Sequence, residues 1–178
     1  MPNRNFIFFI SLVCCVLAGC GTSIVSKLDK GFMTPYLEPA TGQLARLRSI
    51  TGGTIRLIPN SACMNWSIPG AGIVNSRNFA MANDKSFNDR SLGMPTVTPQ
   101  KNSSEVYVSA NQDLTLAATE PQLYITISFR PEPNSDYEFK PVCDRRSCIA
   151  TLSRLKTGTD GSPTIADPVP FKVATQCN

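Results

Sequence analysis

The stretch Gln122–Phe129, which reads QLYITISF, decides the fold. Apolar side chains occupy every second position in it and alternate with Tyr124, Thr126 and Ser128. Successive side chains of a β-strand point to opposite faces of a sheet, so this alternation is typical of a strand with one face in a core. We therefore predict a strand here, with its apolar side chains facing inward.

Further short β-rich runs surround this stretch on both sides. Turn-forming residues separate them, and the chain holds 14 prolines and 11 glycines, too many for long helices. The clearest runs are residues 105–110, 114–119, 136–143, 148–155 and 168–177. About seven or eight short strands with such turns predict an all-β chain that folds as an antiparallel β-sandwich of immunoglobulin-like or transthyretin-like kind.

Two more β-rich runs, residues 43–50 and 54–59, lie upstream with Gly52-Gly53 between them. Strands joined through a Gly-Gly pair are typical of a β-hairpin, so we predict that these two runs pair with each other. Residues 59–103 are the least regular part of the chain. A segment of that length is long for a loop, so it has room for short hidden strands.

The N-terminus carries the features of an export signal. Arg4 is the one charged residue before an apolar run over residues 6–18, and small and polar residues follow that run. A transmembrane helix needs about 20 apolar residues, so the run is too short for a permanent span. We predict that residues 1–19 are a signal peptide that is cleaved.

The end of this run, Leu17-Ala18-Gly19-Cys20, resembles the lipobox of bacterial lipoproteins, in which Leu, a small residue and Gly or Ala precede a Cys. The resemblance implies that Cys20 is the lipid attachment site, bearing diacylglycerol and acyl chains such as palmitate. Gly21 follows instead of Asp. By resemblance to enteric-type lipoproteins, this implies the outer membrane of a Gram-negative bacterium, facing the periplasm. An ordinary signal peptide and a soluble periplasmic protein remain the alternative.

Residues 20–41 show no periodicity, and we predict that they tether the lipid to a single β-sandwich domain over residues 42–178. Phrases of that domain resemble small uncharacterised proteobacterial lipoproteins, among them ARLRSITGGTIRLIPNSAC (residues 45–63) and FRPEPNSDYEF (residues 129–139). The resemblance implies the same fold and location, and it implies no activity.

The cysteines predict two disulfides. Of the 7 cysteines, two lie in the signal peptide and Cys20 takes the lipid, which leaves an even number in an oxidising compartment. Cys143 and Cys148 flank a short loop between two predicted strands, so we expect them to face each other across a hairpin. That pairing leaves Cys63 for Cys177, although four cysteines allow three connectivities. A metal site is the weaker interpretation, because this spacing lacks the tight pairs of zinc ligands.

The residue types exclude several kinds of chemistry. The chain has no histidine, so Ser-His-Asp and Cys-His catalysis and the commonest metal ligand are absent. Asp136 and Glu138 share one face of a predicted strand after a Pro-rich turn. We interpret them as a solvated polar face rather than as the carboxylate pair of a glycosidase. Residues 83–89 contain calcium-loop residue types but lack the turn glycine and the final glutamate. We expect no cofactor and no metal.

The irregular segment is the candidate interaction surface, because long irregular segments on a rigid scaffold are where binding usually occurs. The residues proposed for it are Trp66, Phe79, Met81, Phe87 and Met94. The competing interpretation is that these side chains pin the loops to the sandwich, with Trp66 packed against a disulfide. The net charge of +4 comes from scattered residues, whereas nucleic-acid binding usually needs a basic stripe, so we expect no nucleic-acid partner.

These features together favour a non-enzymatic, lipid-anchored envelope lipoprotein. We expect it to face the periplasm from the outer membrane, held by its N-terminal lipid, and to bind an envelope protein or polymer in an accessory role. Two alternatives stay open. A periplasmic hydrolase inhibitor is expected to present one protruding rigid loop. A carboxylate-dependent cell-wall enzyme is expected to hold two carboxylates with raised pKa values in a deep pocket.

Overall fold

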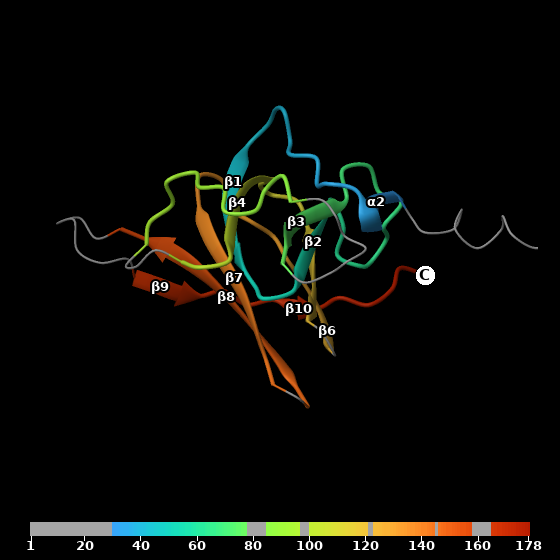
Figure 1. Ribbon diagram of the computed structural model, residues 1–178. Helices are drawn as coiled ribbons and strands as arrows, with labels where there is room; N and C mark the ends of the chain where they lie inside the picture. The colour runs from blue at the N-terminus through green and yellow to red at the C-terminus, as the bar shows by residue number, and fades with distance from the viewer. Residues whose placement is uncertain (1–29, 78–84, 97–99, 121–122, 145, 158–164) are drawn as a thin grey trace, which may run out of the picture.

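Strand β6 (Leu123–Phe129) forms over the alternating run, as predicted. The computed structural model describes residues 30–77, 85–96, 100–120, 123–144, 146–157 and 165–178. In it β6 belongs to one of two five-stranded sheets that pack face to face (Figure 1). The all-β prediction is therefore confirmed, and the protein is a β-sandwich.

The described part of the chain holds ten strands and one short helix, where about seven or eight strands were expected from the spacing of turns. The strands without a predicted counterpart are β3, hidden in the irregular segment, and the edge strand β9, whereas β10 lies within the predicted run 168–177. The elements are α2 (Lys30–Met33), β1 (Leu44–Ile50), β2 (Thr54–Pro59), β3 (Gly72–Ser76), β4 (Ser103–Ser109), β5 (Leu114–Glu120), β6, β7 (Asp136–Cys143), β8 (Cys148–Lys156), β9 (Ile165–Pro168) and β10 (Lys172–Val173).

The first sheet has the strand order β4-β1-β7-β8-β9, and the second has the order β10-β6-β5-β2-β3. Neighbouring strands run antiparallel except β1 and β7, which pair in parallel. The core lies between the sheets and is filled by alternate side chains of both, such as Leu47 and Phe139 from the first and Leu57 and Ile127 from the second. All four of these side chains are fully buried.

The predicted hairpin of residues 43–50 and 54–59 is wrong, because β1 and β2 lie in different sheets. Both edges of β1 are already occupied, one by β4 and the other by β7. The connection through Gly52-Gly53 therefore carries the chain from one layer to the other. A Cβ on Gly53 would lie 2.1 Å from the carbonyl oxygen of Thr119. The glycine is needed for this close approach to β5 and not for a hairpin turn.

Residues 30–38, which we name the N-terminal strap, were expected to be part of the tether but pack onto the second sheet. Tyr36 is buried in the main core, and its backbone N–H donates to the carbonyl of Ile73 on β3. At the start of the strap, Phe32 meets the ring of Trp66 edge-on, with 5.4 Å between the ring centroids. The buried Tyr36 and the partly buried Phe32 extend the domain to α2. Residues 20–29 of the predicted tether lie outside the described residues.

Within the described residues, no helix has both the length and the apolar character that crossing a bilayer requires.

Candidate functional site

Both predicted disulfides are confirmed. Cys63 pairs with Cys177, with 5.2 Å between their Cα atoms, and Cys143 pairs with Cys148, with 4.1 Å between theirs. Cys143 and Cys148 are also direct cross-strand partners, because β7 ends at Cys143 and β8 begins at Cys148. The cysteine count and the short loop between two predicted strands favoured this pairing among the three possible connectivities.

The proposed interaction surface over residues 64–103 does not form as an exposed patch in the described residues. Trp66 is 9% exposed and Met94 is 4% exposed. Phe87 is partly buried against the main core. These three side chains pin loops to the sandwich, because burying them removes apolar surface from water. Phe79 and Met81 lie outside the described residues.

Trp66 belongs to a small cluster on the outer side of the second sheet, together with Ile58, Ala71 and Ala117. Phe32 of the strap packs against this cluster, and its ring also lies under the guanidinium carbon of Arg56 at 3.9 Å. The apolar surroundings lower the pKa of Arg56 to about 10, because burial disfavours its charged form. Trp66 is therefore a structural residue under the strap.

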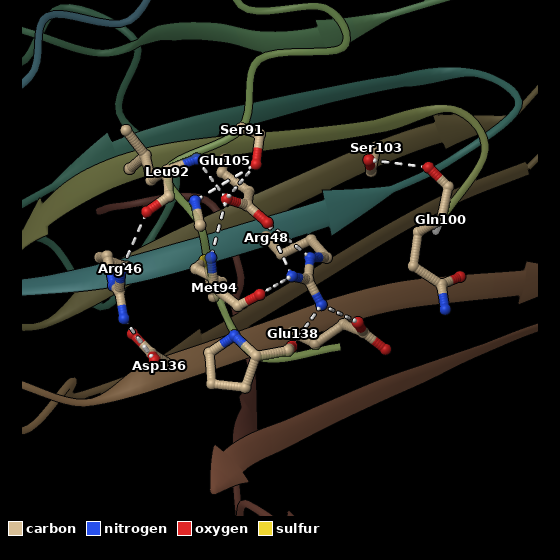
Figure 2. Close-up of polar contacts among 12 residues, drawn as sticks. Arg46, Arg48, Ser91, Leu92, Met94, Gln100, Ser103, Glu105, Asp136 and Glu138 are labelled. Atoms are coloured by element: carbon tan, nitrogen blue, oxygen red, sulfur yellow. Dashed lines mark hydrogen bonds and ion pairs between the residues drawn. The ribbon is translucent and has the colours of Figure 1, made fainter. Parts of the chain in front are cut away.

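The most extensive cluster of polar contacts lies on the outer side of the first sheet (Figure 2). Its centre is Arg48 on β1, which stands in register with Glu105 of β4 on one side and Glu138 of β7 on the other. The guanidinium donates twice to Glu105, at 2.9 and 2.7 Å, and once to Glu138, at 3.1 Å. The three side chains form one charged row across three strands.

A loop crosses this charged row and forms hydrogen bonds with the groups of Arg48 and Glu105 that the row leaves free. Arg48 donates its other two N–H groups to the backbone carbonyls of Met94 and Pro95, both at 3.0 Å. An arginine side chain has five N–H donors in total, so all of them are engaged. The second oxygen of Glu105 accepts the backbone N–H groups of Leu92 and Met94. The charged row thereby fastens the segment Arg90–Pro95 to the sheet.

Arg46, two residues before Arg48 on the same face of β1, likewise pairs with a carboxylate of β7 and with the loop. Its guanidinium forms a bidentate pair with Asp136, at 2.6 and 2.7 Å, and donates to the carbonyl of Leu92 at 3.0 Å. A shallow hollow of about 380 Å³ lies beside it, bordered by Tyr107 and Asn134 among others. The charge of Asp136 is thus committed to a neighbouring arginine.

The interpretation of Asp136 and Glu138 as a solvated face is wrong, since their side chains are only 13% and 24% exposed. Arginines of β1 and the loop above them exclude most of the water. In Glu105, burial alone would raise the pKa of the carboxyl, but the Leu92 N–H and the Arg48 guanidinium together lower it below its ordinary value. A general acid needs the opposite shift, so Glu105 serves here as a charged structural partner of Arg48.

A different feature projects from the sandwich. The hairpin of β7 and β8 extends beyond the rest of the molecule in Figure 1. β1 pairs with β7 only over residues 136–139, and β9 pairs with β8 only over residues 153–156. The last part of the hairpin, residues 140–151, therefore has no further strand beside it among the described residues. We name this part the hairpin tip.

The end of the hairpin tip is closed by several bonds. The disulfide joins Cys143 to Cys148, and the backbone N–H of Asp144 donates to the carbonyl of Ser147 at 2.9 Å. One carboxylate oxygen of Asp144 accepts the backbone N–H groups of Arg146 and Ser147, at 2.7 and 2.8 Å. These backbone hydrogen bonds lower the pKa of Asp144, which keeps it ionised. These bonds join the two sides of the loop.

The hairpin tip exposes apolar side chains. Val142 is 54% exposed and Ile149 is 65% exposed, and the two are direct cross-strand partners. Lys140 lies two residues before Val142, so it shares the same face of the hairpin and is exposed. Sequence analysis predicted the hairpin and its disulfide but missed this face. The signal was present in the alternation of Lys140 and Val142 with the buried Pro141.

Comparison with known proteins adds no assignment: no family model, no curated protein and no solved structure matches this chain.

Proposed function

We propose that the chain is a non-enzymatic, lipid-anchored envelope lipoprotein on the periplasmic side of the outer membrane, and that it binds an envelope partner through the hairpin tip. The observation that supports a binding role is the exposed Val142–Ile149 pair on a projecting hairpin. An apolar pair held out in water is unfavourable for an isolated domain, and such surfaces on soluble proteins often mark interaction sites.

The rigidity of the hairpin tip supports the same role. A loop that is already ordered loses little conformational entropy when it binds, so more of the contact energy appears as affinity. Here the order comes from the Cys143–Cys148 disulfide and from the bonds of Asp144 within the loop. The disulfide and the loop lie beyond the part of the hairpin that packs on the core, which favours a role in recognition.

The N-terminal strap supports an anchored domain that works close to the membrane. The lipid predicted on Cys20 is separated from the packed residue Gly31 only by residues 21–30. An extended chain spans at most about 3.6 Å per residue, so Cys20 and Gly31 lie at most roughly 40 Å apart. Gly31 and the strap that it begins are therefore expected close to the bilayer surface.

An inhibitor of a periplasmic hydrolase is the second candidate. Such an inhibitor is expected to present one protruding rigid loop. The hairpin tip protrudes from the sandwich (Figure 1), and a disulfide closes its end. An enzyme acting through Asp136 and Glu138 is less well supported. Both carboxylates are paired with arginines of β1 under the segment Arg90–Pro95.

Crosslinking in intact cells tests the binding role. A photoreactive benzoylphenylalanine is placed in the full lipid-anchored chain at Ile149 in one variant, and at the exposed positions Leu37 or Val173 in two others. We expect a discrete protein adduct. If none of the three positions gives an adduct, a binding role is contradicted.

Replacement of the anchoring residue tests the location. Cys20→Ser is expected to leave an unprocessed precursor, seen as a larger mass in the membrane fraction. Release of a normally processed, soluble chain from this variant contradicts lipid attachment.

A further inference from the structure

Building on the proposed function, we propose that the hairpin tip lies sideways in a cleft of an envelope protein that has an acidic rim and an apolar wall. Val142 and Ile149 pack against the wall, and Lys140 and Arg146 meet the acidic rim. The inference rests on the order in which apolar and charged side chains occur along the hairpin.

The apolar pair is set back from the end of the hairpin. Beyond Val142 and Ile149 come the disulfide and then Asp144, Arg146 and Ser147, all three exposed. Val142 and Ile149 lie on a single face because they are direct cross-strand partners. Lys140 shares that face, because Pro141 between Lys140 and Val142 points to the buried side. The contact surface is therefore the flank of the hairpin and not its point.

This order disfavours insertion into a bilayer. A hairpin entering end-on would bury Arg146 and Asp144 before Val142 and Ile149 reached the acyl chains, and charged groups are costly to move into hydrocarbon. A protein cleft accommodates the same order easily. Its wall covers the apolar flank, while its mouth leaves the charged end in water or beside acidic groups.

Addition of a partner strand along β7 is also disfavoured. Pro141 has no backbone N–H, and proline on an exposed strand edge blocks strand pairing. Recognition is therefore expected through side chains on the flank, with the backbone of the hairpin already fixed by its disulfide.

The charge of the hairpin tip indicates the chemistry of the partner. Within the described residues, neither Lys140 nor Arg146 takes part in an ion pair. The one acidic side chain nearby, Asp144, accepts hydrogen bonds from its own loop. Arg145 adds a further positive charge in the sequence. An excess of positive charge beside an apolar pair complements an acidic rim around an apolar wall.

The test uses the full lipid-anchored chain in intact cells, with benzoylphenylalanine at Ile149. We expect a protein adduct whose crosslinked peptide, mapped by mass spectrometry, is rich in Asp or Glu. The double variant Lys140→Glu/Arg146→Glu is expected to reduce that adduct by about tenfold or more, because two attractive contacts become repulsive. Changing a crosslinked acidic residue of the partner to Lys should restore the adduct to the double variant.

A matched control carries the same change of charge elsewhere. Lys101→Glu/Lys172→Glu alters two exposed lysines away from the hairpin tip and should leave the adduct from Ile149 unchanged. Both disulfides are mapped in every variant, so that a loss of adduct is not due to misfolding. If the control double variant reduces the adduct as strongly, the effect is one of net charge and the inference is wrong.

Three further results would overturn the inference while leaving a binding role in place. The first is an adduct of phospholipid instead of protein at Ile149, seen in the intact mass. The second is a protein adduct that Lys140→Glu/Arg146→Glu does not weaken. The third is the absence of an adduct at Ile149 when Leu37 or Val173 gives one. The third result also contradicts binding through the hairpin tip, and the absence of adducts from all three positions removes the binding role altogether.

Discussion

Arg48 on β1 and Glu105 on β4 face each other in register, and their ion pair of 2.7 Å leaves only 4% and 5% of the two side chains exposed. The pair is part of the row that fastens the segment Arg90–Pro95 to the first sheet. A buried pair of this kind makes stability sensitive to the removal of either partner, because the other charge is then left without compensation.

We therefore predict that Glu105→Gln lowers the free energy of unfolding by about 3 kcal/mol, the lower end of the range for a broken buried ion pair, because Glu138 still faces Arg48 at 3.1 Å. The amide keeps the shape of the side chain but removes the closer of the two carboxylate charges that compensate Arg48. Urea unfolding measures the change. The matched control is Asp113→Asn, which removes a carboxylate from an exposed pair with Arg130 and should cost about 1 kcal/mol or less. Equal losses in the two variants would show that burial of the pair is unimportant.

The lowered pKa of Glu105 gives a second prediction, on pH dependence. A carboxyl whose pKa is lower in the folded state than in the unfolded state stabilises the fold above the unfolded value, which is about 4.3 for Glu. This contribution is lost as pH falls through the lower, folded value. The free energy of unfolding should therefore decrease below about pH 4.3. Glu105→Gln should show a shallower decrease over the same range, and an identical slope in both proteins would contradict the assignment.

The crossing between sheets gives a third prediction. Gly53→Ala places a methyl group against the Thr119 carbonyl oxygen, 2.1 Å away, so β2 and β5 must separate locally. Overpacking of this kind costs about 1–3 kcal/mol. The neighbouring Gly52→Ala is the control, because its nearest atom, Glu120 Oε2, is 3.8 Å away. The thermal midpoint should fall for Gly53→Ala alone, and a similar fall in both variants would show that the close approach to Thr119 is not the cause.

The N-terminal strap gives a fourth prediction. Phe32→Ala removes the ring that covers both Trp66 and Arg56, so the emission of the single tryptophan should shift to longer wavelength as water reaches it. Loss of a large, partly buried apolar side chain should also lower the free energy of unfolding by about 2–3 kcal/mol. Leu37→Ala, at an exposed position of the same strap, should change neither quantity. An unchanged emission spectrum in Phe32→Ala would mean that the strap does not shield Trp66.

Local patterns predicted the strands and the disulfides. The alternation in residues 122–129 located β6, and two cysteines separated by a short loop located the end of the β7–β8 hairpin. Both features depend on residues close together in the sequence. The position of β2 in the second sheet does not, since it is decided by pairing with β5, far along the chain. The same two glycines are compatible with a hairpin and with a crossing between layers.

The charged row shows why the site was harder to predict. Arg46 and Arg48 alternate with Leu47, which correctly indicates that they point away from the core. Nothing in that pattern shows that residues 90–95 return to cover them, because the covering loop is distant in sequence and irregular. The N-terminal strap was missed for a similar reason. Its aromatic residues have no period, and only the packed sandwich supplies the surface that buries them.

The Cys63–Cys177 disulfide, with a separation of 114 residues, encloses strands β3 to β10 in a covalent ring. A single cut by a protease anywhere between these two residues leaves both fragments in one molecule. Such a nicked chain keeps its C-terminal piece joined to the strap and to any lipid in front of it. The two pieces would separate on a gel only after reduction, so a single cut does not by itself detach the hairpin tip from the N-terminal part of the chain.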